Sequence, residues 1–307
     1  MSTVASVRHS ADQRRMKEAR RTAKGLLAIS PWLLGFMALG LYPIGASFYY
    51  SLTSYSVLSP GKFVGLGNYR YMLFEDKLFW VSLYNTLYFT VLSVGLGTLS
   101  AIILAVLLNL KVRGMAVYRT IYYLPSVVPV VASSVVWLWL FNPQYGIINS
   151  VLYYLGFPSV GWFADPVWAK PALVIMSLWG VGGAVVIYLA ALQDVPQEYY
   201  EAAALDGANS LQQFRSITIA MISPAILFNV VTGLIGAFQY FTQAYVMTRG
   251  GPADSTLFYS LYLYYNAFSY FRMGYASALA WVLFAIILLA TLAVFRTTLS
   301  RVHYAGV

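Results

Sequence analysis

Charged residues are spaced unevenly along the 307-residue chain, and long apolar stretches separate them. Six windows without Asp, Glu, Lys or Arg are each at least 23 residues long. These windows cover residues 25–61, 78–110, 120–164, 171–193, 216–248 and 273–295. Because about 20 apolar residues in helical form cross the hydrocarbon core of a bilayer, the pattern predicts six transmembrane helices. We place them near residues 26–51, 82–109, 118–141, 170–192, 217–246 and 273–296.

A seventh uncharged window, 255–271, holds only 17 residues and is rich in tyrosine. This length is short for a transmembrane helix. We therefore expect an external surface segment here, and a re-entrant course stays open. Proline and glycine interrupt several of the six predicted spans. Proline kinks a helix, and small residues such as Gly180 and Gly182 allow two helices to approach closely.

The composition agrees with a membrane protein, since 60% of residues are hydrophobic and only 9% are charged. A soluble domain carries about 25% charged residues. Cysteine is absent, and the two histidines, His9 and His303, stand near the ends of the chain. This distribution excludes a cysteine-based or histidine-based metal centre and a Ser-His triad within the fold. We predict an all-α membrane protein that has no catalytic residues and no metal site.

The basic residues predict the orientation of the chain in the membrane. With six spans both termini share one side, and that side collects thirteen Lys and Arg, against six on the other side. We expect the richer side, with both termini, to be cytoplasmic. Seven of these residues lie in the first 24, so the net charge of +9 indicates a tail beside anionic lipid and no nucleic-acid partner.

The predicted organisation has four parts. Residues 1–24 form a basic cytoplasmic tail that we expect to be disordered. Residues 25–79 hold the first span and an external loop, residues 80–297 form a core of five helices, and residues 298–307 form a C-terminal cytoplasmic tail.

The cytoplasmic loop 194–216, within the core, is the one long polar stretch between spans on its side, and it predicts two short helices. Pro196 suits a first helical position, and Gly207 suits the stop after a helix. Ser210 followed by Gln213 is a capping-box pattern that would start the second helix. The loop therefore predicts a helix, a sharp turn and another helix.

A short projecting surface follows from the first of these helices. Ala202 and Ala203 leave a nearly bare surface beside the Glu201 carboxylate, and such a surface can enter a groove of a partner. On this pattern alone, a solvated turn is an equal alternative.

The loop resembles the EAA loop of ABC importer permeases. The residues that carry the resemblance are Glu201-Ala202-Ala203, Asp206-Gly207-Ala208, Phe214, Ile217 and Pro224. It implies a type I ABC importer transmembrane domain in which this loop is the coupling helix that enters an ATP-binding subunit. Glu201 would be the acidic contact, Ala202 and Ala203 the packing surface, and Asp206 and Gly207 part of the turn. Ala220 stands where that family usually has proline, so a kink at the start of the fifth span is not implied.

Further segments resemble the maltose-type, sugar-importing permeases, and the resemblance covers about residues 30–296. They are residues 63–69, the run from Arg119 to Trp137 with Gly146 and Asn149, and the predicted external loop that contains Gly250, Gly251 and Pro252 and continues to Thr256. The implied function is one half of the pathway for a sugar or oligosaccharide. The implied partners are a second permease subunit in a heterodimer, two ATP-binding subunits that hold ATP and Mg, and an extracytoplasmic sugar-binding protein. No cofactor is implied for this chain, and the implied location is a bacterial or archaeal cytoplasmic membrane.

Polar and small residues predict which parts of the spans contact the cargo. In the fifth span Asn229, Thr232, Gly236, Gln239, Tyr240 and Gln243 recur at three- and four-residue steps, and the fourth span offers Ser177 and Gly180. Hydroxyl, amide and aromatic groups suit a sugar. The plainer alternative is hydrogen bonding between neighbouring helices.

Three other functions remain as alternatives. An ion-coupled secondary carrier and an intramembrane enzyme are disfavoured because no ionisable residue lies in the middle of a predicted span. Ser133 and Ser134, for example, have no base beside them. An ABC permease for a phosphorylated polyol would need a basic cluster in its path, and none is visible. The chain has no G-x-x-x-x-G-K-[ST] motif, so the energy for active transport would come from another polypeptide.

Overall fold

The computed structural model describes residues 2–110 and 112–298. Within them the chain forms helices joined by loops, with two isolated β-bridges, Thr53 to Phe63 and Ser56 to Ser59. The first half contains α1 (Ser2–Phe36), the π-helical turn η1 (Met37–Leu41), α2 (Tyr42–Ser51), α3 (Gly67–Phe74), α4 (Lys77–Leu108), α5 (Met115–Tyr123), the 3-10 turn η2 (Leu124–Val127), α6 (Val130–Leu140) and α7 (Ile147–Tyr154). The second half contains α8 (Pro166–Trp179), α9 (Gly182–Gln193), α10 (Gln197–Leu205), α11 (Ser210–Gln213), the π-helical turn η3 (Phe214–Thr218), α12 (Ile219–Met221), α13 (Ser223–Phe238), α14 (Thr242–Met247), α15 (Tyr259–Tyr264), the π-helical turn η4 (Tyr265–Ser269) and α16 (Met273–Thr298).

Helices that are long and apolar enough to cross a membrane account for the predicted spans. Four candidate spans cover Arg20–Ser51, Lys77–Leu108, Ser223–Met247 and Met273–Thr298. Two bent pairs, α5–η2 with α6 and α8 with α9, bring the number in the described residues to six if each pair is one span. The prediction of an all-α membrane fold is confirmed.

The two bent pairs break where proline or glycine interrupts the helix. The α5–η2 segment and α6 meet at 102°, with Pro125 in the turn and Pro129 before the first residue of α6. The α8 and α9 helices meet at 44° across Gly180 and Val181. A Cβ atom on Gly182 would lie 2.6 Å from the Tyr122 carbonyl oxygen. The expected close helix contact therefore exists at Gly182, because only glycine leaves room for the backbone of Tyr122 and Tyr123.

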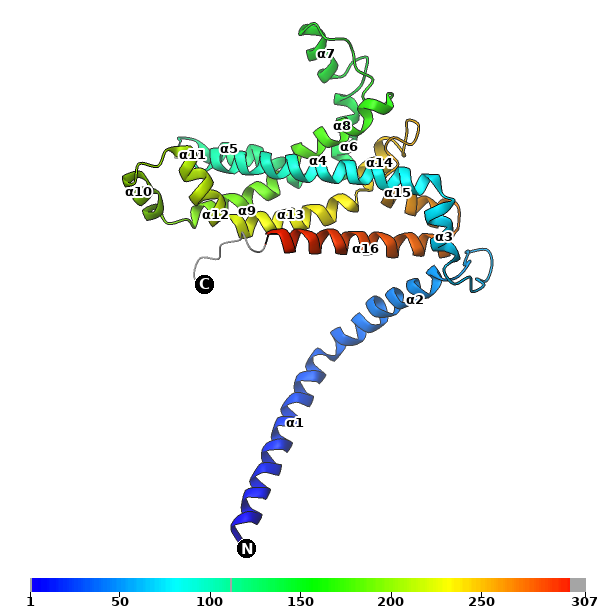
Figure 1. Cartoon of the computed structure of the whole chain (residues 1–307), viewed down its shortest axis with the longest axis vertical. Helices are drawn as coiled ribbons and strands as arrows, with labels where there is room; N and C mark the ends of the chain where they lie inside the picture. Colours follow the sequence, from blue (N-terminus) through cyan, green and yellow to red (C-terminus); the bar gives the residue numbers. More distant parts are fainter. Residues whose placement is uncertain (1, 111, 299–307) are drawn as a thin grey trace.

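The long helices lie alongside one another, and the loop elements gather at the two ends (Figure 1). The axes of α4, α13 and α16 are nearly aligned, with α13 running opposite to the other two, and α10 lies at one end of this bundle and α3 at the other. The α1 helix leaves the bundle, while α2 packs against α16. Residues 2–24, expected to be disordered, are helical; they contain no glycine or proline and are rich in strong helix formers. Nearly all of the predicted tail 298–307, with His303, lies outside the described residues.

Two apolar clusters form the core. One cluster joins α4 to α9 and includes Ala105, Tyr188 and Leu192. The larger cluster takes in much of the segment 255–271 that we expected at the external surface. Within it Phe258 and Tyr259 are fully buried. The expectation of a surface segment was wrong for residues 255–267, which pack against other helices, whereas Phe268, Tyr270 and Phe271 are exposed.

A buried carboxylate connects three elements at the α3 end of the bundle. Oδ1 of Asp76 accepts hydrogen bonds from the backbone N–H groups of Leu78 (3.0 Å) and Phe79 (3.2 Å), at the start of α4. Its Oδ2 accepts the hydroxyl of Tyr262 at 2.6 Å and that of Tyr275. Burial, with the hydrogen bond to Asp76, raises the pKa of Tyr262 above its usual value of 10.0. These bonds hold α4, α15 and α16 together.

Candidate functional site

The loop predicted to dock on a partner forms two short helices in the structure. The α10 helix follows Pro196, which lies one residue before the first helical position that we predicted for it. Gly207 ends it with φ of +82°. The Ala208 N–H donates to the Ala203 carbonyl (2.9 Å) and the Gly207 N–H to the Ala204 carbonyl (3.1 Å). This pair of bonds is the Schellman motif, so the prediction that Gly207 stops the helix is confirmed.

The second helix of the loop begins one residue away from the predicted cap. Asn209, and not Ser210, precedes α11, and its side-chain oxygen accepts from the N–H groups of Leu211 (3.1 Å) and Gln212 (3.0 Å). The Gln212 side chain accepts the Asn209 N–H at 2.8 Å. The predicted capping box of Ser210 and Gln213 was therefore wrong by one position. Asn is as good an N-cap as Ser, and here it has the matching glutamine.

The α10 helix presents a bare, acidic surface. Glu201, Ala202 and Asp206 are exposed and Ala203 is half-buried. Leu205 is 90% exposed. A groove of about 380 Å³ runs between this helix and the segment 216–221, with Ala202 and Ala203 on its wall. Small residues beside a groove leave room for a partner to approach this helix closely.

One hydrogen bond and a series of short helical segments connect α10 with the membrane part of the chain. The Tyr200 hydroxyl lies 3.0 Å from Oγ1 of Thr218 in η3. From η3 the chain continues through α12 and a break at Ile222 into α13. Ile222 is fully buried against α4 and α9. Ala220 stands where the family usually has proline, yet the helix is interrupted at Ile222. The next helix, α13, begins at Ser223, and Pro224 is its second residue.

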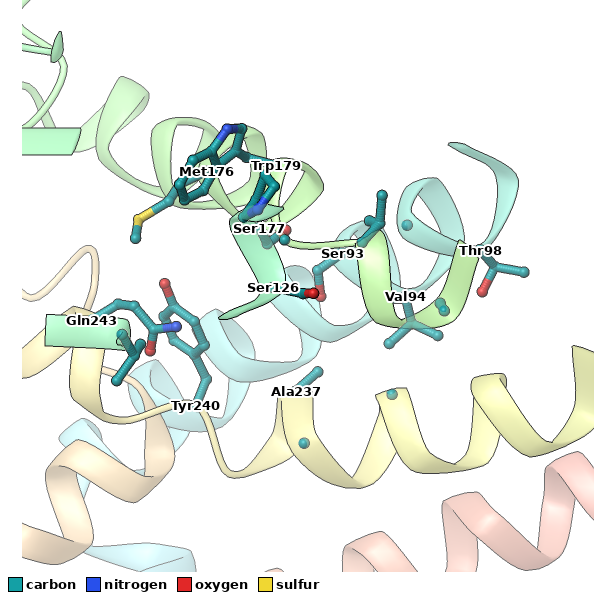
Figure 2. Close-up of a pocket in the computed structure, with 18 of the residues that line it drawn as sticks. Ser93, Val94, Thr98, Ser126, Met176, Ser177, Trp179, Ala237, Tyr240 and Gln243 are labelled. Atoms are coloured by element: carbon teal, nitrogen blue, oxygen red, sulfur yellow. The ribbon is translucent and has the colours of Figure 1, made fainter. Parts of the chain in front are cut away.

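A central cavity of about 420 Å³ lies between α4, η2, α8, α9 and α13 (Figure 2). Six of the eight residues predicted to meet the cargo line it, namely Ser177, Gly180, Asn229, Gly236, Tyr240 and Gln243. The other two residues lie elsewhere. The Thr232 hydroxyl bonds back to the Phe228 carbonyl at 2.9 Å, and Gln239 is exposed at the end of α13.

The lining of the central cavity is uncharged and mixes apolar side chains with a few hydroxyl and amide groups. Ser93, Ser126 and Ser177 gather in the middle of Figure 2, while Tyr240 and Gln243 lie together to one side. The Ser93 hydroxyl is buried and has no hydrogen-bond partner in the structure. Among the described residues that line the cavity there is no Asp, Glu, Lys, Arg or His. The described residues also contain no cluster of acidic or histidine side chains that could hold a metal ion.

The loop that contains Gly250, Gly251 and Pro252 is tightly closed. The Thr256 hydroxyl lies 2.6 Å from Oγ1 of Thr248 and 2.7 Å from the Gly251 carbonyl oxygen. The peptide bond between Gly251 and Pro252 is cis, and Gly250 has φ of +93°.

Sequence reasoning missed the residues that anchor this loop to the bundle. Asn85 of α4 donates from its side-chain amide to the carbonyls of Asp254 (2.8 Å) and Leu257 (3.1 Å). The Lys170 ammonium donates to the Asn85 side-chain oxygen at 2.9 Å and lies over the ring of Tyr84. No local motif links these positions, so no signal in the sequence could have identified them.

Residues 93–302 match the family described as "Binding-protein-dependent transport system inner membrane component". The chain belongs to this family. The predicted resemblance to ABC importer permeases and the predicted location in the cytoplasmic membrane are confirmed. Members of the family are components of transport systems.

The permease resembles named relatives along most of its length. It is 41% identical over 297 residues to the "Probable ABC transporter permease protein YesP" of Bacillus subtilis, covering 94% of this chain and 96% of the relative. It is 34% identical over 269 residues to the "Sulfoquinovosyl glycerol transport system permease protein SmoG" of Agrobacterium fabrum, covering 87% of each.

A crystal structure of a bacterial ABC transporter involved in the import of the acidic polysaccharide alginate has the same fold. The TM-score is 0.79, with 23% sequence identity and coverage of 93% of this chain and 98% of the other. At this identity the match establishes the ABC importer transmembrane fold and nothing beyond it.

Proposed function

We propose that this permease forms one half of the membrane pathway of an ATP-driven importer for a sugar or oligosaccharide. A second permease subunit completes the pathway as a heterodimer, and two ATP-binding subunits hold ATP and Mg and hydrolyse the nucleotide. An extracytoplasmic binding protein delivers the sugar. The observation that carries the proposal is the exposed α10 helix with Glu201, Ala202 and Ala203, in a chain of the binding-protein-dependent family.

The coupling step follows from the connection between α10 and the central cavity. Closure of the ATP-binding subunits displaces α10, with Glu201 as the acidic contact and the two alanines as the packing surface. The Tyr200–Thr218 hydrogen bond and the short helices after it pass this displacement to α13. Because Asn229 and Gly236 of α13 line the cavity, a movement of this helix changes access to the cargo.

The lining of the cavity supports an uncharged sugar as the cargo. Serine hydroxyls, the amides of Asn229 and Gln243, and the rings of Trp179 and Tyr240 are the groups that bind sugar hydroxyls and apolar ring faces. A phosphorylated polyol would require cationic groups, and the described lining residues include none. The tight loop with Gly250, Gly251 and Pro252 would lie on the opposite side from α10, facing the binding protein.

Reconstitution of the purified transporter tests this function. Affinity purification of the permease should recover the second permease and the ATP-binding subunits. Proteoliposomes should accumulate a radiolabelled neutral saccharide only with internal ATP and the binding protein. Glu201→Lys should abolish uptake, while Glu198→Lys, on an earlier turn of α10, serves as the matched charge reversal and should reduce it less.

Two results would contradict parts of this proposal. Uptake by the purified chain alone, driven by a Na⁺ gradient without ATP, would establish a secondary carrier instead. Preference for a phosphorylated polyol over the neutral saccharide would replace the cargo but leave the ATP-driven mechanism intact.

A further inference from the structure

A second cavity, of about 380 Å³, lies at the end of the bundle opposite α10. It is formed by the loop after α2, by α3, and by the turn that leads into α16. Five aromatic side chains and one arginine dominate its wall, namely Tyr55, Tyr71, Tyr270, Phe271, Tyr275 and Arg272. We call this the arginine socket. It shares no lining residue with the central cavity, so it is not a further section of the same path.

The aromatic walls of the arginine socket are held in place by contacts behind them. The Tyr275 hydroxyl donates to the buried Asp76 carboxylate, and the edge of the Tyr275 ring meets the Tyr71 ring at a centroid distance of 5.3 Å. Tyr55 stacks on Tyr50 at 4.7 Å. The socket is therefore formed before any ligand arrives, which reduces the entropy lost on binding.

Among the described residues that line the socket, Arg272 is the one with a charged side chain. Its backbone is fixed, because its N–H donates to the carbonyl of Asn266 at 2.8 Å and the preceding residue, Phe271, has φ of +56°. Among the described residues, the Arg272 guanidinium has neither a hydrogen bond nor an ion pair, and no Asp or Glu lines the socket. A guanidinium offers five donors in a planar fork that matches a carboxylate.

We infer that the arginine socket receives an Asp or Glu side chain of the extracytoplasmic binding protein. The inference rests on the proposed function, which places this end of the bundle on the outer side. Charge complementarity identifies the carboxylate, because the Arg272 guanidinium is exposed, has no partner among the described residues and lies beside aromatic rings. Arginine and tyrosine side chains are enriched in binding hot spots, so this composition suits an interface with another protein. A carboxylate-bearing sugar is the other source of this chemistry, but the socket lies off the central cavity.

The affinity of the binding protein for the transporter tests the socket. The complete transporter in nanodiscs is titrated with the sugar-loaded binding protein that supports ATP-driven uptake in the reconstitution above. Arg272→Gln should raise the Kd about tenfold, since a hydrogen-bonded contact to a charged group is lost. Arg272→Lys should recover part of the affinity. Lys62→Gln removes the same charge from the same predicted side, outside the socket, and should change the Kd less than twofold.

A charge exchange and a folding control complete the test. Arg272→Glu should weaken binding further, and one Asp→Arg or Glu→Arg change in the binding protein should restore it. The melting temperature and basal ATPase activity of each variant should match those of the unchanged transporter.

Two results would overturn the assignment. One is an equal Kd for Arg272→Gln and Lys62→Gln. The other is Arg272-dependent binding of free D-glucuronate to the transporter without binding protein, which would make the socket a sugar site. Failure of the unchanged transporter to respond to any binding protein would contradict the proposed function itself, so the two failures are distinguishable.

Discussion

Replacement of Gly207 by alanine tests the coupling helix with a cost that the structure defines. Gly207 has φ of +82°, and a Cβ atom added there would meet nothing within 4 Å. The substitution therefore introduces no clash, and its cost is the left-handed backbone alone, about 1–2 kcal/mol for a residue other than glycine. This energy corresponds to about a 5- to 30-fold change in the population of the intact Schellman turn after α10.

Gly156 provides a matched control, because its φ is +83° and it also has nothing within 4 Å of an added Cβ. Gly156→Ala should therefore lower the unfolding free energy as much as Gly207→Ala, by about 1–2 kcal/mol. Only Gly207→Ala should reduce the sugar transported per ATP hydrolysed, because only this turn ends the helix that meets the ATP-binding subunit. Gly207→Asn should retain more coupling, since asparagine tolerates this conformation.

The assay measures binding-protein-stimulated ATP hydrolysis and uptake in the same proteoliposomes, with thermal unfolding of each variant in detergent. Equal transport-to-ATP ratios for Gly207→Ala and Gly156→Ala, at equal stability loss, would refute the reasoning. The effect of Gly207 would then be a general loss of stability and not a loss of coupling.

Three further predictions concern the stability of the bundle. Asp76→Asn should lower the unfolding free energy by about 1.5–3 kcal/mol, because its hydrogen bonds lose a charged acceptor. The change Glu75→Gln at the exposed neighbouring residue should alter the unfolding free energy by less than about 0.5 kcal/mol. Thermal unfolding measures both variants, and equal effects would contradict a role for Asp76. The raised pKa of Tyr262 means that its stabilising contribution is complete below pH about 10 and is lost as the pH rises further, so Tyr262→Phe should reduce the alkaline fall in melting temperature. Gly182→Ala should lower the unfolding free energy by about 1–3 kcal/mol, because the added methyl group meets backbone atoms. Gly183→Ala, whose added methyl group has nothing within 4 Å, should leave the unfolding free energy unchanged or raise it. Urea unfolding measures both variants.

Local sequence features predicted the spans and the coupling loop well, because they depend on local physics. An uncharged window of more than 20 residues has few alternatives to a transmembrane helix. A glycine after a short acidic helix is a direct signal for a left-handed stop, and Gly207 confirms it. The cap of α11 was assigned one residue too late because Asn209 and Ser210 are both good N-caps and each has a glutamine three residues further on.

Contacts between distant parts of the chain could not be predicted from the sequence. The carboxylate of Asp76 meets Tyr262 and Tyr275, which are 186 and 199 positions away. No periodic pattern links such residues, so the burial of residues 255–267 was missed. Helical spacing also failed at Gln239, because α13 ends at the preceding residue and the face does not continue through the break.

The docking of α10 on an ATP-binding subunit is the central claim, and site-specific cross-linking tests it most directly. The chain contains no cysteine, so Ala202→Cys and, as the control, Ser59→Cys in the opposite loop each introduce a single reactive thiol. Both residues are exposed. In the assembled transporter, Ala202→Cys should cross-link to the ATP-binding subunit and Ser59→Cys should not. Labelling of Ala202→Cys from outside intact cells, or absence of its cross-link in a transporter that still hydrolyses ATP and imports sugar, would contradict the account.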